Sequence, residues 1–238
     1  MKDNIDILNS YKRIRKLIGI LGLLLPFLIV IFYWGFLPSI SLFYYTRSAV
    51  FFIAILAAFG LLLISYKGYG PKENEKGLSD NLVSHLGGFA ILIVVLVPTA
   101  CLDTKFNVCN VCISGKYCLF GHQIKCINYV HLISAGLFFF FMGYMSLINF
   151  TRGSDKKYHF MYKLCGYTIW VSLILLVIEF IIRLLTKKDF NLTGYDVYIL
   201  ETIMVFAFAT SWLLKGRTIE YFIEFKNCLL KFLRLKKA

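Results

Sequence analysis

Charged residues are scarce in this sequence. Only 16% of its 238 residues are Asp, Glu, Lys or Arg, whereas a soluble domain of this size has about 25%. Acidic residues are the scarcest, with 13 against 26 basic residues, and the formal net charge is +13. So few charges could not cover a surface that faces water on all sides. The composition therefore excludes an ordinary soluble globular domain.

The sequence also lacks the short motifs of several protein classes. It has neither a P-loop nor the G-x-S-x-G motif of a serine hydrolase. Its basic residues are spread over several segments instead of forming one patch, so we expect no nucleic-acid partner. No segment predicts a cofactor. The absence of these motifs favours a protein without enzymatic activity.

Apolar residues, by contrast, are abundant and clustered. They make up 59% of the chain, and the mean hydropathy is +0.72. They form six blocks of about 18–24 residues, the length with which an α-helix crosses a bilayer. We therefore predict an all-α fold, a polytopic membrane bundle within residues 1–216, with transmembrane helices at about 17–37, 48–66, 82–100, 127–150, 164–185 and 197–214.

The distribution of basic residues predicts how this bundle is oriented. Four segments, 1–16, 67–81, 151–163 and 215–238, carry 19 of the 26 Lys and Arg residues and would lie on one side of the membrane. By the positive-inside rule, both termini are cytoplasmic. Residues 217–238 predict a basic amphipathic helix, either a membrane-surface anchor or a docking helix for a partner.

A cysteine-rich loop separates the third and fourth blocks. Five of the seven cysteines lie in residues 101–126, which the charge distribution places outside the cytoplasm, where cysteines oxidise. We predict disulfides among Cys109, Cys112, Cys118 and Cys126, and we expect Cys101 to be left unpaired. A zinc site that includes His122 and free thiols are the two alternatives.

Ionisable residues within the apolar blocks are costly and therefore informative. Arg47, His131 and Glu201 each lie about one turn from the predicted outer end of a helix, and we expect a polar pocket there, near the outer leaflet. We expect Glu201 to be ionised and paired with Arg47. The other candidate residues of this pocket are Tyr45, Asp103 and Glu179.

Several segments together resemble a known architecture. They are Ser39 to Arg47, Tyr66 to Tyr69, Asp80 to Gly88, Val97 to Thr99, Val130 to Phe139, Tyr162 to Gly166 and Glu201 to Gly216. They resemble a group of bacterial six-helix membrane proteins of uncharacterised activity, which is more distantly similar to the DRAM and Sfk type. The resemblance covers about residues 35–216. It implies a multi-pass protein of the bacterial inner membrane, but no reaction.

Three functions remain open on this basis. The favoured one is a helical bundle that binds or senses a lipid or small molecule in the outer pocket, with membrane lipids as its partners. One alternative is a subunit of a channel or transporter, which would form a homo-oligomer. The other is a metal-dependent membrane lipid hydrolase, in which His131 and His122 would act with Asp103 and Glu201; the sequence itself predicts no metal site.

Overall fold

All regular elements of the described chain are helices. The structure, a computed structural model, describes residues 2–68, 77–101, 125–152, 156–186 and 193–217, and these contain no strand. The elements are α1 (Lys2–Tyr33), the 3-10 helix η1 (Ile40–Tyr45), α2 (Ala49–Ile64), α3 (Asp80–Leu96), α4 (Lys125–Tyr144), the π-helical turn η5 (Met145–Asn149), the 3-10 turn η6 (Lys156–Tyr158), α5 (His159–Thr186) and α6 (Asp196–Lys215). The prediction of an all-α fold is confirmed.

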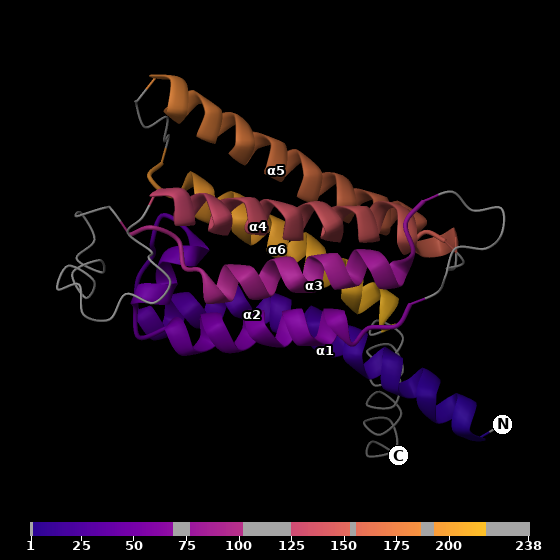
Figure 1. Cartoon of the computed structure of the whole chain (residues 1–238). Helices are drawn as coiled ribbons and strands as arrows, with labels where there is room; N and C mark the ends of the chain where they lie inside the picture. The colour runs from indigo at the N-terminus through magenta and orange to yellow at the C-terminus, as the bar shows by residue number, and fades with distance from the viewer. Residues whose placement is uncertain (1, 69–76, 102–124, 153–155, 187–192, 218–238) are drawn as a thin grey trace, which may run out of the picture.

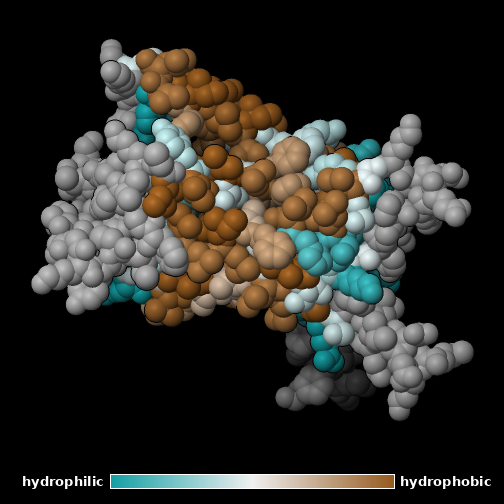
Figure 2. All heavy atoms as spheres, in the orientation of Figure 1, coloured by the Kyte–Doolittle hydropathy of each residue, from teal (hydrophilic) through white to brown (hydrophobic). Residues whose placement is uncertain are grey.

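Four of these helices are long and apolar enough to cross a membrane. The spans are Lys12–Tyr33 in α1, Ile127–Asn149 in α4 and η5, Lys156–Thr186 in η6 and α5, and Asp196–Lys215 in α6. The other two apolar helices, α2 and α3, have 16 and 17 residues. A wide hydrophobic band lies across the bundle, and hydrophilic side chains gather towards its ends (Figure 2). These features are those of an integral membrane protein.

The helices pack in the order of the chain. Each helix from α1 to α5 packs against the next, and α6 closes the arrangement by packing against both α5 and α1. Figure 1 shows the helices running along one common direction, with α5 diverging from α4 and α6 towards its own C-terminal end. The buried residues of α5, such as Tyr162 and Ile169, all lie in its first half. The second half of α5 is therefore the least covered part of the bundle.

Two ends of the bundle can be distinguished. The terminal end is the one at which α2 ends, α3 begins and α6 ends, and α1 begins beyond it (Figure 1). The far end is the opposite one, where α1 ends, α3 ends and α6 begins. The side chains predicted for the polar pocket, Arg47, His131 and Glu201, lie towards the far end.

Glycines allow three pairs of helices to approach closely. A methyl group added at Gly22 of α1 would lie 2.8 Å from Cβ of Ala209 on α6, and one added at Gly88 of α3 would lie 2.9 Å from the carbonyl oxygen of Gly60 on α2. Between α5 and α4, a methyl group at Gly166 would lie 3.0 Å from the carbonyl oxygen of Gly143. Small residues at such crossings are typical of membrane helices, which associate by close packing.

The first helix differs from its predicted bounds at both ends. It begins at Lys2 because the polar residues before the apolar block continue the helix, and hydropathy alone detects only the apolar part. It ends at Tyr33 because Trp34 has a positive φ of 67°, where the chain leaves the helix. Residues up to Leu37, predicted as helix, therefore belong to the connection that leads to η1.

Candidate functional site

The element η1 organises the far end of the bundle. The chain leaves α1 at Trp34, passes Pro38 and forms the 3-10 helix Ile40–Tyr45 before α2 begins. Phe43 of η1 is fully buried against the core, and Ser48, which precedes α2, donates its hydroxyl to the carbonyl oxygen of Ile29 on α1 at 2.7 Å. These contacts hold η1 across the end of the bundle instead of leaving it as a surface loop.

Glu201 of α6 holds the first residue of η1. Its carboxylate oxygen Oε2 accepts a hydrogen bond from the backbone N–H of Ile40 at 2.6 Å. A neighbouring contact on the same helix supports this arrangement, because the backbone N–H of Tyr198 donates to the carbonyl oxygen of Pro38 at 2.9 Å. Glu201 therefore satisfies an N–H at the start of η1 that has no partner within so short a helix.

His131 of α4 holds the second residue of η1. Its Nδ1 lies 2.6 Å from the carbonyl oxygen of Val97, and its Nε2 lies 3.0 Å from the hydroxyl of Ser41. Because a carbonyl oxygen can only accept, Nδ1 carries the proton and donates, and Ser41 donates its hydroxyl to Nε2. The Val97 carbonyl is free for this contact because α3 ends at Leu96, immediately before Val97 and Pro98.

A third contact fixes the last residue of η1. The hydroxyl of Tyr45 donates to the carbonyl oxygen of Thr99, in the segment that follows α3, at 2.5 Å. That segment is in turn bound to α4, because Asn128 Oδ1 accepts from the backbone N–H of Ala100 at 2.7 Å and from the Thr99 hydroxyl at 3.2 Å. Hydrogen bonds to η1 thus come from α6, from α4 and from the end of α3.

A small cavity lies beneath η1, inside the bundle. Its volume is about 40 Å³, and only two of its lining residues, Ser41 and Glu201, are polar. The apolar lining residues come from α1, η1, α2, α3, α4 and α6: Leu25, Ile40, Phe52, Leu56, Phe59, Ile91, Val94, Ala135, Phe138, Phe139 and Val205. This volume suffices for a few water molecules. It is far below the roughly 300 Å³ at which pockets for drug-sized ligands begin.

Aromatic rings fill the bundle between this cavity and the terminal end. Phe208 of α6 packs on Phe59 and Phe138 with ring centroids 5.3 and 5.6 Å apart, and on Trp212 at 6.1 Å. Trp212 then packs on Tyr66 and Phe150, both at 5.2 Å. This aromatic column closes the interior below the cavity in the structure described here.

The structure separates Arg47 from the other predicted pocket residues. Arg47 is exposed, and its Nη2 donates a long hydrogen bond of 3.4 Å to the carbonyl oxygen of Tyr33. Among the described residues, no ion pair joins it to Glu201, whose hydrogen bond is made to Ile40. The predicted pairing is therefore wrong. Both residues lie towards the far end, but Arg47 precedes α2 and is exposed, whereas Glu201 lines the interior cavity.

The other residues predicted for the pocket lie in different parts of the structure. Tyr45 and His131 both contact the network around η1. Glu179 lies in the second half of α5, where the helix diverges from the bundle, and does not line the cavity. Asp103 lies outside the described residues. His131 uses both ring nitrogens in hydrogen bonds, and no group of three potential metal ligands occurs in the parts of the chain that the structure describes.

The structure describes little of the cysteine-rich loop. Cys109, Cys112 and Cys118 lie outside the described residues, as does the tail from residue 218, and only the backbone of Cys126 is described, in the first turn of α4. Cys101 is buried and disulfide-bonded, so the expectation that it is left unpaired is wrong. Cys165 is a free, buried thiol on α5.

Several functional candidates were missed in the sequence. Ser41 gave no signal on its own, because a serine between two apolar blocks is an ordinary loop residue. Lys215 belongs to the basic segment 215–238 but is buried at the terminal end, where it contacts the carbonyl oxygen of Phe150. Arg15 and Asn149 are also buried there. A periodicity analysis of α1 could have found Arg15, since it lies one turn before the buried Ile18.

Comparison with known proteins identifies no relative. A scan against family models, a search of curated proteins and a search of solved structures each give no match.

Proposed function

We propose that this chain is a six-helix integral membrane protein that binds a lipid or small molecule at the far end of its bundle. Both termini would be cytoplasmic, and the far end would face the outer leaflet of a bacterial inner membrane. The predicted excess of basic residues on the terminal side, 19 of 26, supports this orientation. The resemblance to bacterial six-helix membrane proteins supports the choice of membrane.

The count of six crossings depends on α2 and α3. At 1.5 Å per residue, their 16 and 17 residues extend over about 24 and 26 Å. α2 runs beside α1, and α3 runs beside α4, over much of the length of the bundle (Figure 1). Non-helical backbone at membrane depth is tolerated where protein buries it. The 3-10 helix η1, which precedes α2 at the far end, would therefore complete the crossing of the hydrocarbon core that α2 is too short to span alone.

The observation that carries the binding proposal is a carboxylate in a cavity whose other lining residues, apart from Ser41, are apolar. Glu201 makes one described hydrogen bond, to the backbone of Ile40, although a carboxylate can accept about four. A ligand with a hydroxyl or ammonium group would find an acceptor there. The cavity is too small for such a ligand as it stands, so binding requires η1 to move away from α4 and α6.

The test is mass spectrometry of compounds that stay bound to the purified protein. Wild type and Glu201→Leu would be extracted from the same cell membranes and analysed for lipids and small molecules. A compound enriched on the wild type and lost from Glu201→Leu supports the proposal. Arg47→Ala is the control, because Arg47 lies outside the cavity and its loss should leave the bound compound in place. Identical extracts from wild type and Glu201→Leu would contradict the proposal.

One observation favours a second candidate, a serine hydrolase or acyltransferase. Ser41 lines the cavity, donates to His131 Nε2 at 3.0 Å, and His131 is oriented by the Val97 carbonyl. A hydroxyl, a base and a group that orients the base are the parts of an activated nucleophile. A fluorophosphonate probe tests this candidate. Labelling that disappears in Ser41→Ala would support it, and an unlabelled wild type would contradict it.

A further inference from the structure

A second polar cluster lies at the terminal end, on the other side of the aromatic column from Glu201. Its charged members are Arg15 of α1, Asp80 at the start of α3 and Lys215 at the end of α6, and their exposed fractions are 8%, 3% and 9%. Arg15 and Asp80 both act electrostatically on Lys215, so the three charges are neighbours. Together they carry one excess positive charge, which is unusual for a buried position.

Aromatic residues hold the two cations in place. Arg15 Nη2 donates to the hydroxyl of Tyr66 at 3.0 Å, and the guanidinium lies 5.3 Å from the centre of the same ring. Lys215 Nζ donates to the carbonyl oxygen of Phe150 at 3.3 Å and lies 5.2 and 5.9 Å from the rings of Phe150 and Tyr162. A guanidinium has five N–H donors and an ammonium three, so these contacts use only part of their capacity. In particular, Arg15 Nε makes no hydrogen bond.

Asn149 provides the independent observation. It is 1% exposed, and neither its Oδ1 nor its Nδ2 has a hydrogen-bond partner. It ends the π-helical turn η5, which packs against α3 and α5, and it precedes Phe150, whose carbonyl holds Lys215. A buried amide without partners is destabilising and needs an explanation. Single π-helical turns are frequent at functional sites.

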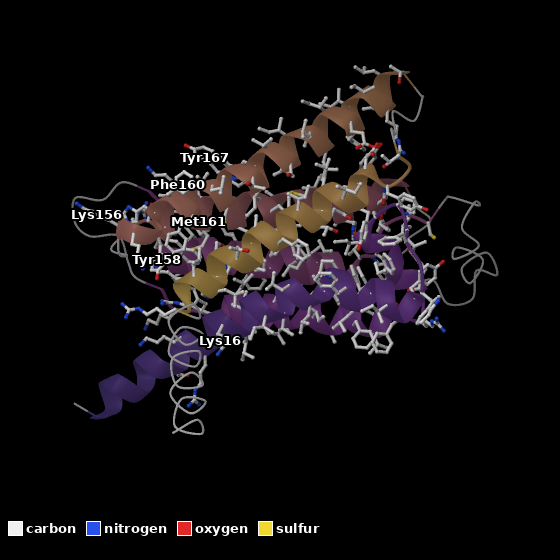
Figure 3. The ribbon with its side chains drawn as sticks, turned by 180° about the vertical axis from the view of Figure 1, so that it is seen from behind. Lys16, Lys156, Tyr158, Phe160, Met161 and Tyr167 are labelled. Atoms are coloured by element: carbon white, nitrogen blue, oxygen red, sulfur yellow. The ribbon has the colours of Figure 1, made fainter. Side chains whose placement is uncertain are left out.

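The surface beside this cluster has the composition of a membrane interface. Figure 3 places Lys16, Lys156, Tyr158, Phe160, Met161 and Tyr167 at the same end of the bundle. Phe160 and Tyr167, on the outer face of α5, are 73% and 58% exposed. Aromatic and basic residues occur together at the level of lipid headgroups. The buried cations therefore lie at the depth at which phosphates of one leaflet are available.

We propose that Arg15, Lys215 and Asn149 form a binding site for a phosphate group, separate from the site beneath η1. The planar fork of Arg15 matches two phosphate oxygens, Lys215 adds a second charge-assisted bond, and Asn149 Nδ2 adds a neutral donor. Asp80 balances one of the two cations, which leaves a positive charge for the ligand. The phosphate belongs either to an anionic lipid headgroup or to free inorganic phosphate, and the experiment below distinguishes these two sources.

The experiment measures thermal unfolding of the full chain in phosphate-free maltoside micelles. One arm compares phosphatidic acid with diacylglycerol, which has the same chains but no phosphate. The other compares inorganic phosphate with chloride at equal ionic strength. An unfolding temperature raised by phosphatidic acid but not by diacylglycerol identifies a lipid headgroup, and one raised by inorganic phosphate identifies the free ion. No rise in either arm overturns the proposal.

Substitutions at three positions, Lys215, Lys163 and Asn149, test where the phosphate compound binds. Lys215→Met should weaken the apparent affinity about tenfold or more, as expected for a lost charge-assisted hydrogen bond. Lys163→Met is the matched control, since Lys163 is an exposed lysine near the start of α5 and its loss should leave the affinity unchanged. Equal weakening in both variants would indicate general surface attraction and overturn the proposal.

Asn149→Leu keeps the proposal testable if Lys215→Met does not fold. This change removes a buried amide without partners, so the ligand-free protein should unfold at a higher temperature than the wild type. The response to the phosphate compound should nevertheless weaken, because a donor to the ligand is lost. An unchanged response in Asn149→Leu would show that Asn149 is not part of a phosphate site and would overturn the proposal.

Discussion

At the scale of single residues, His131 is a buried side chain that makes two hydrogen bonds. It is 1% exposed, and its two ring nitrogens contact Val97 and Ser41, which come from different parts of the chain. A neutral imidazole can satisfy one acceptor and one donor at the same time, and no apolar side chain of similar size can do this. The position therefore requires, for structural reasons, a side chain that both donates to Val97 and accepts from Ser41, whatever chemistry Ser41 performs.

Replacing this histidine tests that requirement. We expect His131→Phe to lower the free energy of unfolding by about 1–3 kcal/mol for each group left unpaired, the Val97 carbonyl and the Ser41 hydroxyl. His85→Phe is the control, because His85 is partly exposed and contacts only the Asn81 carbonyl of its own helix at 2.6 Å. It should change stability by about 0.5 kcal/mol or less. Equal losses in the two variants, measured by unfolding in detergent, would contradict this role.

Glu201 and Arg47 are expected to act independently. Glu201→Leu removes the acceptor for the Ile40 N–H and should destabilise the protein by about 1–3 kcal/mol. Glu201→Gln keeps an acceptor oxygen and should lose much less. Arg47→Ala should be nearly neutral because Arg47 is exposed. Thermal unfolding of the three variants checks this. If Arg47→Ala lost as much stability as Glu201→Leu, the result would contradict this independence and support the ion pair predicted from the sequence.

At the scale of helices and connections, two helices approach closely where Gly60 of α2 faces Gly88 of α3. A methyl group at Gly88 would meet Cγ1 of Ile64 at 2.8 Å and the carbonyl oxygen of Gly60 at 2.9 Å. The second contact involves backbone, which cannot rotate away as a side chain can. These two short helices therefore depend on glycine for their packing.

Alanine substitutions measure this dependence. Gly88→Ala should force α2 and α3 apart and lower the free energy of unfolding by about 1–3 kcal/mol. Gly136→Ala on α4 is the matched control, since a methyl group there would meet nothing within 4 Å. Because alanine is the better helix former, the control should be neutral or slightly stabilising. If Gly88→Ala were as stable as Gly136→Ala in a detergent unfolding assay, the close packing of α2 and α3 would be contradicted.

Helix positions were predictable from the sequence to the extent that hydropathy determines them. Apolar blocks locate the central part of each helix, as at Ala49–Ile64 and Asp196–Lys215, because crossing a bilayer requires a continuous apolar run. Hydropathy could not show that α1 extends to Lys2 or that Ile40–Tyr45 folds inwards as η1. The placement of η1 depends on partners elsewhere in the chain, namely Glu201, His131 and Thr99.

The candidate site was predictable only in part, for the same reason. His131 and Glu201 were identified because an ionisable side chain in an apolar block is costly and indicates a structural or functional role. Their partners were not found, because a backbone N–H such as that of Ile40 has no signature in a sequence, and a serine such as Ser41 has no distinctive one. Arg47 was wrongly paired because depth along a helix gives no information about which face of the helix a residue occupies.

At the scale of the whole molecule, the oxidation state of the cysteine-rich loop indicates on which side of the membrane the loop lies. Cys101 is disulfide-bonded, and five cysteines can form at most two disulfides among themselves. We therefore expect Cys101 and three of Cys109, Cys112, Cys118 and Cys126 to be oxidised, because the proposed orientation places residues 101–126 outside the cytoplasm. Mass spectrometry after alkylation, with and without prior reduction, counts the thiols. Cys165 serves as the internal control, since it is a free thiol within the bundle. Bound zinc together with fully reduced loop thiols would contradict the prediction.

The orientation and the number of crossings together form the central claim, because they decide whether Glu201, Ser41 and His131 face the outer leaflet. With six crossings, the segment 69–76 between α2 and α3 lies in the cytoplasm. With four crossings, through α1, α4, α5 and α6 only, the same segment would lie on the opposite side, together with the loop 102–124. The two arrangements agree on the position of both termini, so only the segment 69–76 separates them.

Reporter insertion at this segment is therefore the most direct measurement. Two reporters would be placed separately within 69–76, within 102–124 and after Ala238. Alkaline phosphatase is active only outside the cytoplasm. Green fluorescent protein fluoresces in the cytoplasm but not after export by the general secretion pathway. The account predicts fluorescence within 69–76 and after Ala238, and phosphatase activity within 102–124. Phosphatase activity within 69–76 or after Ala238 would contradict it.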